Sequence, residues 1–182
     1  MAHPFHSIRR RAGVEQELKF IADTDAFDAA LALPLLGGPD QRSSRRLESV
    51  YYDTEDDDLA RAGVWLRVRH EDGACVLCLK RASASEGAFE RDEQEVKSPS
   101  SEPDLALLDP ATARDLAETI GGKGLRPRFG SEVRRTARTV EFEGAALEVA
   151  LDSGFLFAGE RREPLREIEL ELKSGPSGAL FA

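Results

Sequence analysis

Cysteine, histidine and tryptophan are scarce in this sequence, with two cysteines, three histidines and one tryptophan in 182 residues. Cys75 and Cys78 have the C-x-x-C spacing of some metal and redox sites. They lie in a run typical of a β-strand, where residues three apart point to opposite faces, so they cannot share one ion. Because the chain has no second cysteine pair, we interpret both as structural residues.

Long apolar runs are also missing, which excludes a membrane-spanning helix. The basic residues 1–12 are not followed by the apolar stretch of a signal peptide. Acidic residues outnumber basic ones by 34 to 25, and the net charge of −9 repels the phosphates of nucleic acids and anionic membranes. We therefore expect a cytoplasmic protein with no nucleic-acid or membrane partner.

The length and composition fit one globular domain. Apolar residues make up 41% of the chain, enough for one core. Residues 1–12 show no periodicity and are expected to form a disordered basic leader, which leaves 13–182 as a single domain. A stretch with glycine and proline at 174–178 is followed by a short apolar segment, 179–182, which predicts the start of a helix. We expect this helix to continue into a further C-terminal domain of the natural protein.

Local patterns predict an antiparallel α+β domain of about eight strands with turns between neighbours. The turn at 71–73 is a hairpin whose Gly73 suits a positive φ angle. Thr24 is the expected N-cap of the first helix. Helical segments are expected at 24–33, at 56–61 and within 104–120, and strands at 14–21, 47–53, 64–70, 74–81, 89–96, 132–142, 146–151, 155–158 and 165–173.

Charged and apolar side chains alternate on five of these strands. In 14–21, for example, Glu17 and Lys19 share one face, and Leu18 and Phe20 share the other. A sandwich with solvated charged faces would explain one such strand, but both signs of charge recur on nearly every one. The helices also have apolar faces that must cover something. We therefore predict a closed barrel with apolar faces outward under helices and charged faces lining the interior.

The predicted interior contains two complementary sets of side chains. Crowded carboxylates repel one another and fit a hard divalent cation, so the expected cofactor is Mg²⁺ or Mn²⁺. Guanidinium and ammonium groups match phosphate oxygens. A phosphate chain that carries metal satisfies both sets, which is the chemistry of phosphoryl transfer. The carboxylates are Glu15, Glu17, Asp152, Glu169 and Glu171, and the cations are Lys19, Arg67, Arg69, Lys80 and Arg135.

Several motifs occur in the order typical of one protein family: E-Q-E-L-K at 15–19, Y-Y-D-T at 51–54, G-V-W-L-R-V-R at 63–69, R-D-E at 91–93 and E-I-E-L-E-L-K at 167–173. With these motifs the chain resembles the CYTH family, the triphosphate tunnel metalloenzymes, over residues 14–182. The resemblance is greatest to the bacterial inorganic triphosphatases, in which a helical CHAD domain often follows. It implies an eight-stranded antiparallel closed β-barrel that forms a tunnel, in agreement with the alternation of charge.

The resemblance also assigns roles to individual residues. Many family members have a lysine two residues after the arginine at 135, where this chain has Ala137. Either the terminal phosphate is bound more weakly here, or the alignment with the family is shifted by one residue. The implied metal ligands are Glu15, Glu17, Asp152, Glu169 and Glu171, with Glu93 or Glu95 opposite them. The implied phosphate-binding residues are Lys19, Arg67, Arg69, Lys80, Arg91, Arg135 and, as a weaker candidate, Lys173. The expected catalytic residues are Glu15, Glu17, Lys80 and Asp152.

The expected function is metal-dependent hydrolysis of the terminal phosphoanhydride bond of a short linear triphosphate, with inorganic triphosphate as the first choice. Thiamine triphosphatase and class IV adenylyl cyclase activities would use the same site, and a non-catalytic polyphosphate-binding module is a further alternative. Trp65 shares a strand face with Arg67 and Arg69, and is either a packing residue at the barrel end or a stacking platform for an organic group. The arginines at 42, 45 and 46 are interpreted as a solvated loop.

Overall fold

The computed structural model describes residues 13–82 and 90–182, and the side chains of 13–15, 82, 90 and 91 lie outside that description. The leader expected at 1–12 also lies outside the described residues. Within the described part, eight strands and three α-helices form an α+β structure, which confirms the expected class. The strands are β1 (Gly13–Ile21), β2 (Ser43–Asp53), β3 (Val64–Glu71), β4 (Ala74–Ala82), β5 (Glu90–Ser98), β6 (Arg126–Phe142), β7 (Ala145–Ala158) and β8 (Arg161–Ser174).

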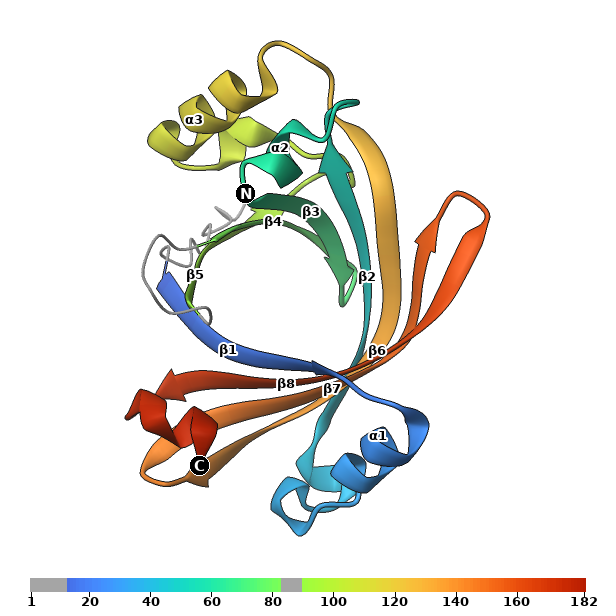
Figure 1. Ribbon diagram of the computed structural model, residues 1–182, viewed down its shortest axis with the longest axis vertical. Helices are drawn as coiled ribbons and strands as arrows, with labels where there is room; N and C mark the ends of the chain where they lie inside the picture. Colours follow the sequence, from blue (N-terminus) through green and yellow to red (C-terminus); the bar gives the residue numbers. More distant parts are fainter. Residues whose placement is uncertain (1–12, 83–89) are drawn as a thin grey trace, which may run out of the picture.

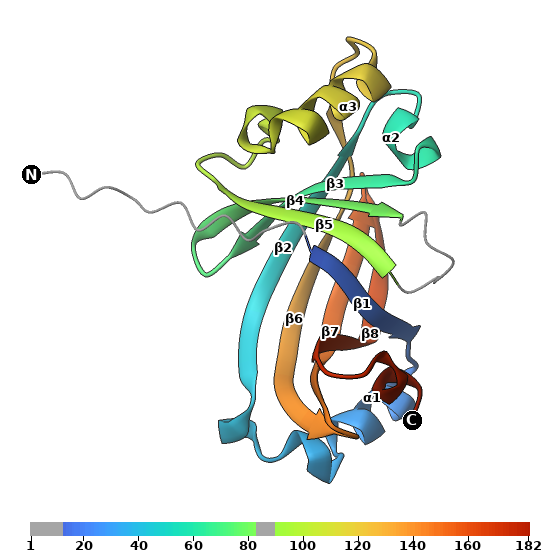
Figure 2. The ribbon, with the colours of Figure 1, turned by 90° about the vertical axis from the view of Figure 1, so that its left-hand side faces the viewer.

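The eight strands form one strongly curled antiparallel sheet (Figure 1, Figure 2). Along the sheet the strand order is β1-β5-β4-β3-β2-β6-β7-β8. The order closes on itself because the first half of β1 pairs with β5 and the second half with β8. The curling turns one face of every strand toward a common interior.

Three α-helices lie outside the curled sheet: α1 (Thr24–Leu31), α2 (Asp58–Arg61) and α3 (Pro110–Ile120). Figure 1 shows α2 and α3 together beside β3 and β4, and α1 at the other end of the molecule, where the C-terminal 3₁₀ turn η4 (Ser177–Phe181) also lies. None of the described helices is long and apolar enough to cross a membrane.

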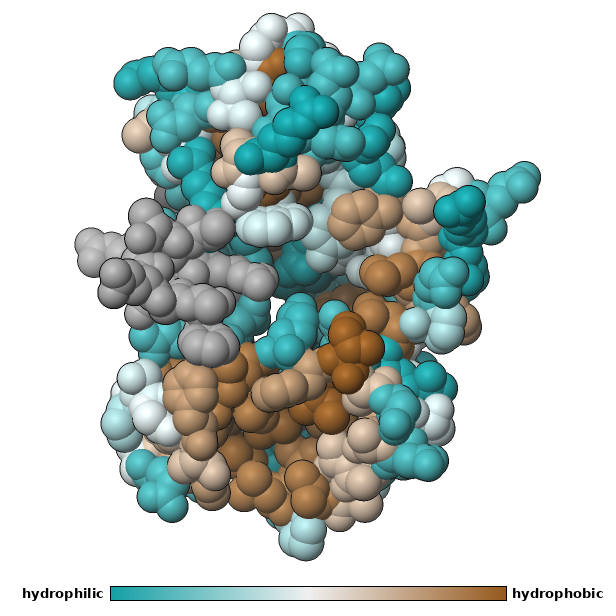
Figure 3. Space-filling view, in the orientation of Figure 1, coloured by the Kyte–Doolittle hydropathy of each residue, from teal (hydrophilic) through white to brown (hydrophobic). Residues whose placement is uncertain are grey.

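The apolar faces of the strands point outward and pack under these helices. Leu66 of β3 and Leu77 of β4 are fully buried with Leu59 of α2 and Leu116 of α3. Burying one such leucine stabilises the fold by roughly 1.5–3 kcal/mol. A second cluster joins the outer faces of β7 and β8 to α1 and η4. In Figure 3, hydrophilic side chains are visible inside the central opening, while apolar ones border its right-hand side and gather over the lower half of the molecule.

β7 is one continuous strand, although two separate strands, 146–151 and 155–158, are expected from the sequence. The glycine at position 154 does not mark a turn. A Cβ atom there would come within 2.0 Å of the carbonyl oxygen of Glu132 on β6, so glycine lets the two backbones approach closely.

Several other boundaries differ from expectation. β6 begins at Arg126 rather than at 132, and β8 begins at Arg161 rather than at 165. β2 begins at Ser43 rather than at 47, so Arg45 lies in a strand and not in a solvated loop. The N-cap of α1 is Asp23, whose carboxylate accepts a hydrogen bond from the Ala26 amide at 2.8 Å, and not Thr24. Aspartate and threonine are both favourable N-cap residues, so the local sequence does not distinguish between the two neighbouring positions.

Candidate metal and phosphate site

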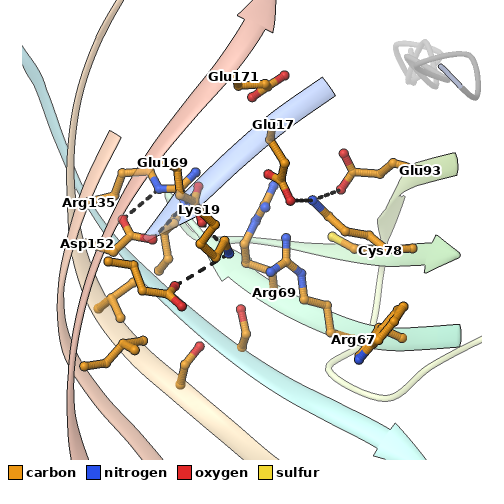
Figure 4. A pocket seen from close by; sticks show the side chains of 18 of the residues that line it. Glu17, Lys19, Arg67, Arg69, Cys78, Glu93, Arg135, Asp152, Glu169 and Glu171 are labelled. Carbon is orange, nitrogen blue, oxygen red and sulfur yellow. Dashed lines mark hydrogen bonds and ion pairs between the residues drawn. The ribbon is translucent and has the colours of Figure 1, made fainter. Parts of the chain in front are cut away.

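A cavity of about 430 Å³ lies inside the curled sheet, with lining residues from all eight strands (Figure 4). The alternation of side chains along each strand places the charged face in this cavity. Every predicted site residue whose side chain is described lines it. They are Glu17, Lys19, Arg67, Arg69, Lys80, Glu93, Glu95, Arg135, Asp152, Glu169, Glu171 and Lys173.

Two predicted residues, Glu15 and Arg91, are placed only by their backbone. They are register partners on β1 and β5. Their side chains lie outside the described residues, so their roles as metal ligand and phosphate-binding residue stay predictions.

Asp152, Glu167 and Glu169 form a carboxylate cluster on one wall of the cavity. One oxygen from each lies within 4.8 Å of the others, and Asp152 and Glu169 are buried. Asp152 and Glu167 are register partners on β7 and β8, and Glu169 follows on the same face. This all-oxygen donor set fits a hard divalent cation.

Two cations, Arg135 and Lys19, compensate part of the negative charge of the cluster. The Arg135 guanidinium donates to both oxygens of Asp152, at 2.8 and 2.7 Å, and Lys19 Nζ lies 2.5 Å from Glu169 and 3.6 Å from Glu167. Burial alone would raise the pKa of Glu169, but Arg135 and Lys19 lower it to about 2. Burial also pulls down the pKa of Lys19, yet Glu169 and Glu167 outweigh it and leave that pKa raised. Both partners are therefore charged at neutral pH.

Glu167 is the least compensated member of the cluster. Burial raises its pKa, and repulsion by Glu169 and Asp152 adds to the rise against the attraction of Lys19. The charged face of its strand was evident in the sequence, but Glu167 was not among the predicted ligands. Only its pairing with Asp152 brings it into the cluster.

The wall formed by β4 and β5 combines cations and carboxylates in the same way. Lys80 Nζ lies 3.5 Å from Glu93 and 3.9 Å from Glu17 of β1. Figure 4 shows Glu17 and Glu93 on the same side of the cavity. Arg69 donates to Glu95 at 3.0 Å. Both Glu93 and Glu95 face the cavity, and which of them would face a metal stays a prediction.

Arg67 lies between Tyr51 and Cys78 on the cavity wall. Its Nη1 donates to the Tyr51 hydroxyl at 3.1 Å. Burial lowers the pKa of Arg67, but Tyr51 and Cys78 raise it well above its usual value, so the guanidinium stays charged. Cys75 lies next to His70 and is absent from the cavity lining, which confirms that the two cysteines point to opposite faces. Cys78, interpreted from the sequence as structural, lines the cavity.

Arg45 and Glu148 also line the cavity, although neither was predicted as a site residue. Arg45 is the register partner of Arg135, and Glu148 lies 3.6 Å from Lys173. Glu148 could have been found, because it shares a strand face with Asp152 in the sequence. Arg45 was missed because the strand was expected to begin two residues after it.

Ala137, in the place of a family lysine, is buried and pairs with Ser43 on β2 and Ala150 on β7. The flanking arginines, Arg134 and Arg138, do not place a cation in the cavity where the family lysine would lie. Arg134 is exposed, and Arg138 contacts Gln41 at 3.4 Å on the outer side.

The chain matches the CYTH domain over residues 14–182, and it belongs to this family. It is 36% identical over 143 residues to an inorganic triphosphatase of Haemophilus influenzae. The match covers 74% of this chain but 38% of the relative, so the chain spans little more than a third of that relative's length.

Two solved structures share the fold. A candidate adenylate cyclase from Bacillus halodurans superposes with a TM-score of 0.60 and 18% identity, over 88% of this chain and 81% of that one. A candidate adenylyl cyclase from Hippeastrum, described as having a dominant triphosphatase activity, gives a TM-score of 0.55 and 22% identity, over 88% and 80% of the two chains. At these identities the likeness concerns the fold alone.

Proposed function

We propose that this protein is a metal-dependent triphosphatase that hydrolyses the terminal phosphoanhydride bond of a short linear triphosphate, with inorganic triphosphate as substrate. The observation that carries the proposal is a buried carboxylate cluster beside a group of phosphate-matched cations in one cavity. Membership of the CYTH family and the identity to an inorganic triphosphatase support it.

The proposed cofactor is Mg²⁺ or Mn²⁺, held by Asp152, Glu167 and Glu169. Glu17 and Glu171 are register partners on β1 and β8 that line the same cavity, and they would supply further oxygen ligands. When bound, the metal would neutralise charge on the phosphate oxygens and orient the attacking water. The donor atoms are all carboxylate oxygens, which both ions accept.

The cations of the cavity are proposed to bind the triphosphate and to stabilise the charge that develops on the departing diphosphate. Glu93 and Glu95 lie beside two of them and are proposed to fix their orientation as well as to face the metal. Because these side chains are already held in place, binding substrate orders few of them further. The phosphate-binding set is Lys19, Arg67, Arg69, Lys80, Arg135 and, nearer one end, Lys173.

The curled sheet is proposed to work as a closed tunnel. The strand order closes on itself, and the charged side chains point into the enclosed space. Limited access of water strengthens the attraction between these cations and phosphate.

An organic triphosphate is the second candidate substrate. Trp65 is 41% exposed and lines the same cavity as Arg67. An indole in this position could stack on a thiamine ring or a nucleobase attached to the phosphates.

Phosphate release from inorganic triphosphate, thiamine triphosphate and ATP, assayed side by side with and without EDTA, tests the proposal. We expect inorganic triphosphate to be hydrolysed fastest and EDTA to abolish the reaction. Faster release from an organic triphosphate would favour the second candidate. Tight triphosphate binding with no release under any metal condition would indicate a non-catalytic polyphosphate-binding module instead.

A further inference from the structure

Arg67 differs from the other cations of the cavity in what surrounds its charge. In the part of the chain that the structure describes, every other cation lining the cavity forms an ion pair with at least one carboxylate, whereas Arg67 forms none. The paired cations are Lys19, Arg45, Arg69, Lys80, Arg135 and Lys173. Arg67 is therefore the described cavity cation whose charge no carboxylate compensates directly.

Two uncharged groups hold the Arg67 guanidinium instead. Its Nη1 donates to the Tyr51 hydroxyl at 3.1 Å, and a second polar interaction joins it to the Cys78 sulfur. A phenol hydroxyl is uncharged at neutral pH. Arg67 and Arg69 pull down the pKa of the Cys78 thiol, but burial outweighs them and leaves that pKa raised, so the thiol is uncharged as well. These contacts orient the guanidinium and leave its charge intact.

The contacts of Arg67 follow one line across four strands. Tyr51 of β2, Arg67 of β3, Cys78 of β4 and Glu95 of β5 are successive register partners, and all four line the cavity. Directly opposed residues on neighbouring strands have their Cβ atoms about 5 Å apart. We call these four residues the Arg67 row. Strand pairing alone therefore places a polar group on each side of the guanidinium.

The hydrogen bonds of the row fix what position 78 must supply. An arginine can only donate hydrogen bonds, and an ionised carboxylate can only accept them. Arg69 donates to Glu95 at 3.0 Å, and it lowers the pKa of this buried carboxyl. The Cys78 thiol donates to the same carboxylate at 3.3 Å, so its sulfur lone pairs remain for Arg67. A hydroxyl at position 78 could replace the thiol in both contacts, but a methyl group could not.

On the other side of Arg67, the Tyr51 ring is itself fixed. It is stacked on Phe129 of β6, with ring centroids 4.4 Å apart and ring planes 11° apart. The guanidinium carbon of Arg67 lies 5.9 Å from the centroid of the Tyr51 ring, within the range of a cation–π contact. The hydroxyl that accepts from Arg67 is thus held by a packed aromatic pair.

From these contacts we propose that Tyr51 and Cys78 are positioning residues, which hold the Arg67 guanidinium toward the triphosphate without neutralising it. The assignment rests on the function proposed above. Arg67 is then the first anchor for an incoming phosphate, because each of the other described cations must share its charge with a carboxylate. A guanidinium that is already oriented also loses less conformational freedom on binding.

Calorimetric titration with sodium tripolyphosphate in EDTA tests the assignment without catalysis. We expect Tyr51→Phe, which keeps the stacked ring, and Cys78→Ala each to weaken binding about tenfold. Cys78→Ser should bind nearly as tightly as wild type, because a hydroxyl both accepts and donates. Tyr52→Phe is the matched control. Its hydroxyl donates to the Ser101 carbonyl at 3.0 Å outside the cavity, so its removal should leave the affinity unchanged.

Two further measurements separate positioning from a general structural role. In an Arg67→Gln background, Tyr51→Phe and Cys78→Ala should cause no additional loss of affinity, because both act through the guanidinium. With metal present, the single variants should raise KM for triphosphate and leave kcat close to the wild-type value. Circular dichroism confirms that each variant is folded.

Several outcomes would overturn the assignment. Wild-type affinity in Tyr51→Phe and Cys78→Ala would show that Arg67 needs neither group, and equal losses in Cys78→Ala and Cys78→Ser would show that only packing matters. Full additional losses in the Arg67→Gln background would mean that the two residues act independently of Arg67. Failure of the wild type to bind tripolyphosphate in EDTA would exclude Arg67 as the first anchor. If the wild type binds tripolyphosphate but releases no phosphate with metal, the triphosphatase proposal fails while the positioning result stands.

Discussion

Arg135 and Asp152 are register partners on β6 and β7, and the guanidinium of Arg135 donates from Nε and Nη2 to the two oxygens of the Asp152 carboxylate. A third donation, from Nη2, reaches Glu169. Arg135, the proposed phosphate-binding cation, thus occupies the lone pairs that a metal ion would use. Metal and phosphate are therefore expected to bind together, since phosphate draws Arg135 away from the carboxylates as the metal replaces it.

Replacing Arg135 tests whether this arginine and the metal compete for the same carboxylates. Arg135→Gln should bind Mn²⁺ more tightly than wild type in the absence of phosphate, because the carboxylates lose their competing cation. The same variant should bind tripolyphosphate more weakly. Electron paramagnetic resonance titration of Mn²⁺ measures the first effect and calorimetry the second. Arg134→Gln, the exposed neighbour on the same strand, is the control. Weaker Mn²⁺ binding by Arg135→Gln would contradict the exchange.

Removing one ligand charge should abolish catalysis but not folding. Glu169→Gln keeps the shape of the side chain and is expected to lower kcat by orders of magnitude. Glu163→Gln, on an exposed part of β8, should leave kcat unchanged. Phosphate release measures the rate, and circular dichroism confirms the fold. Wild-type turnover in a folded Glu169→Gln protein would exclude this carboxylate as a metal ligand.

The same carboxylate should make stability depend on acid pH. The pKa of Glu169 is lowered from 4.5 to about 2 in the folded protein, so the unfolded chain binds this proton more readily. The stabilisation is full above 4.5 and is lost as the pH falls from 4.5 to about 2. It amounts to roughly 3 kcal/mol. Urea unfolding across this window should show a steeper loss of stability in wild type than in Glu169→Gln, and parallel curves would refute the assignment.

Glu167 should have the opposite effect on the way stability depends on pH. Its pKa is raised in the folded protein, so its contribution to stability falls as the pH rises through 4.5 and up to the folded pKa. Glu167→Gln removes this cost and should raise the melting temperature of the metal-free protein at neutral pH. It should also weaken Mn²⁺ binding. A lower melting temperature in EDTA would show that the ion pair with Lys19 outweighs the repulsion.

Replacing Trp65 distinguishes an inorganic from an organic triphosphate as the substrate. If inorganic triphosphate is the substrate, Trp65→Ala should lower stability slightly and leave KM for triphosphate nearly unchanged. If an organic triphosphate is the substrate, the loss of stacking should raise its KM by the equivalent of about 1–3 kcal/mol. Steady-state kinetics on triphosphate and thiamine triphosphate decide between the two. We expect the first result, and a selective loss of thiamine triphosphate turnover would reverse the preference.

Local alternation along the chain is enough to predict which face of each strand is charged. Alternation has a period of two, so Glu17 and Lys19, or Arg67 and Arg69, must share a side wherever their strand lies. Two signs of charge on one set of faces, with apolar faces opposite, leave few arrangements other than a curled sheet with a charged interior. The proposal of metal-and-phosphate chemistry followed from the residue types alone.

Which residues on different strands meet depends on how the strands pair in the folded protein. Pairing of Glu167 with Asp152 made Glu167 part of the carboxylate cluster, and pairing of Arg45 with Arg135 brought an arginine expected in a loop to the cavity. Register depends on hydrogen bonds between strands far apart in the chain, and a shift of one residue would reverse every face. The local pattern therefore specifies which side chains of each strand face the interior. Pairing between distant strands specifies which of these side chains are neighbours.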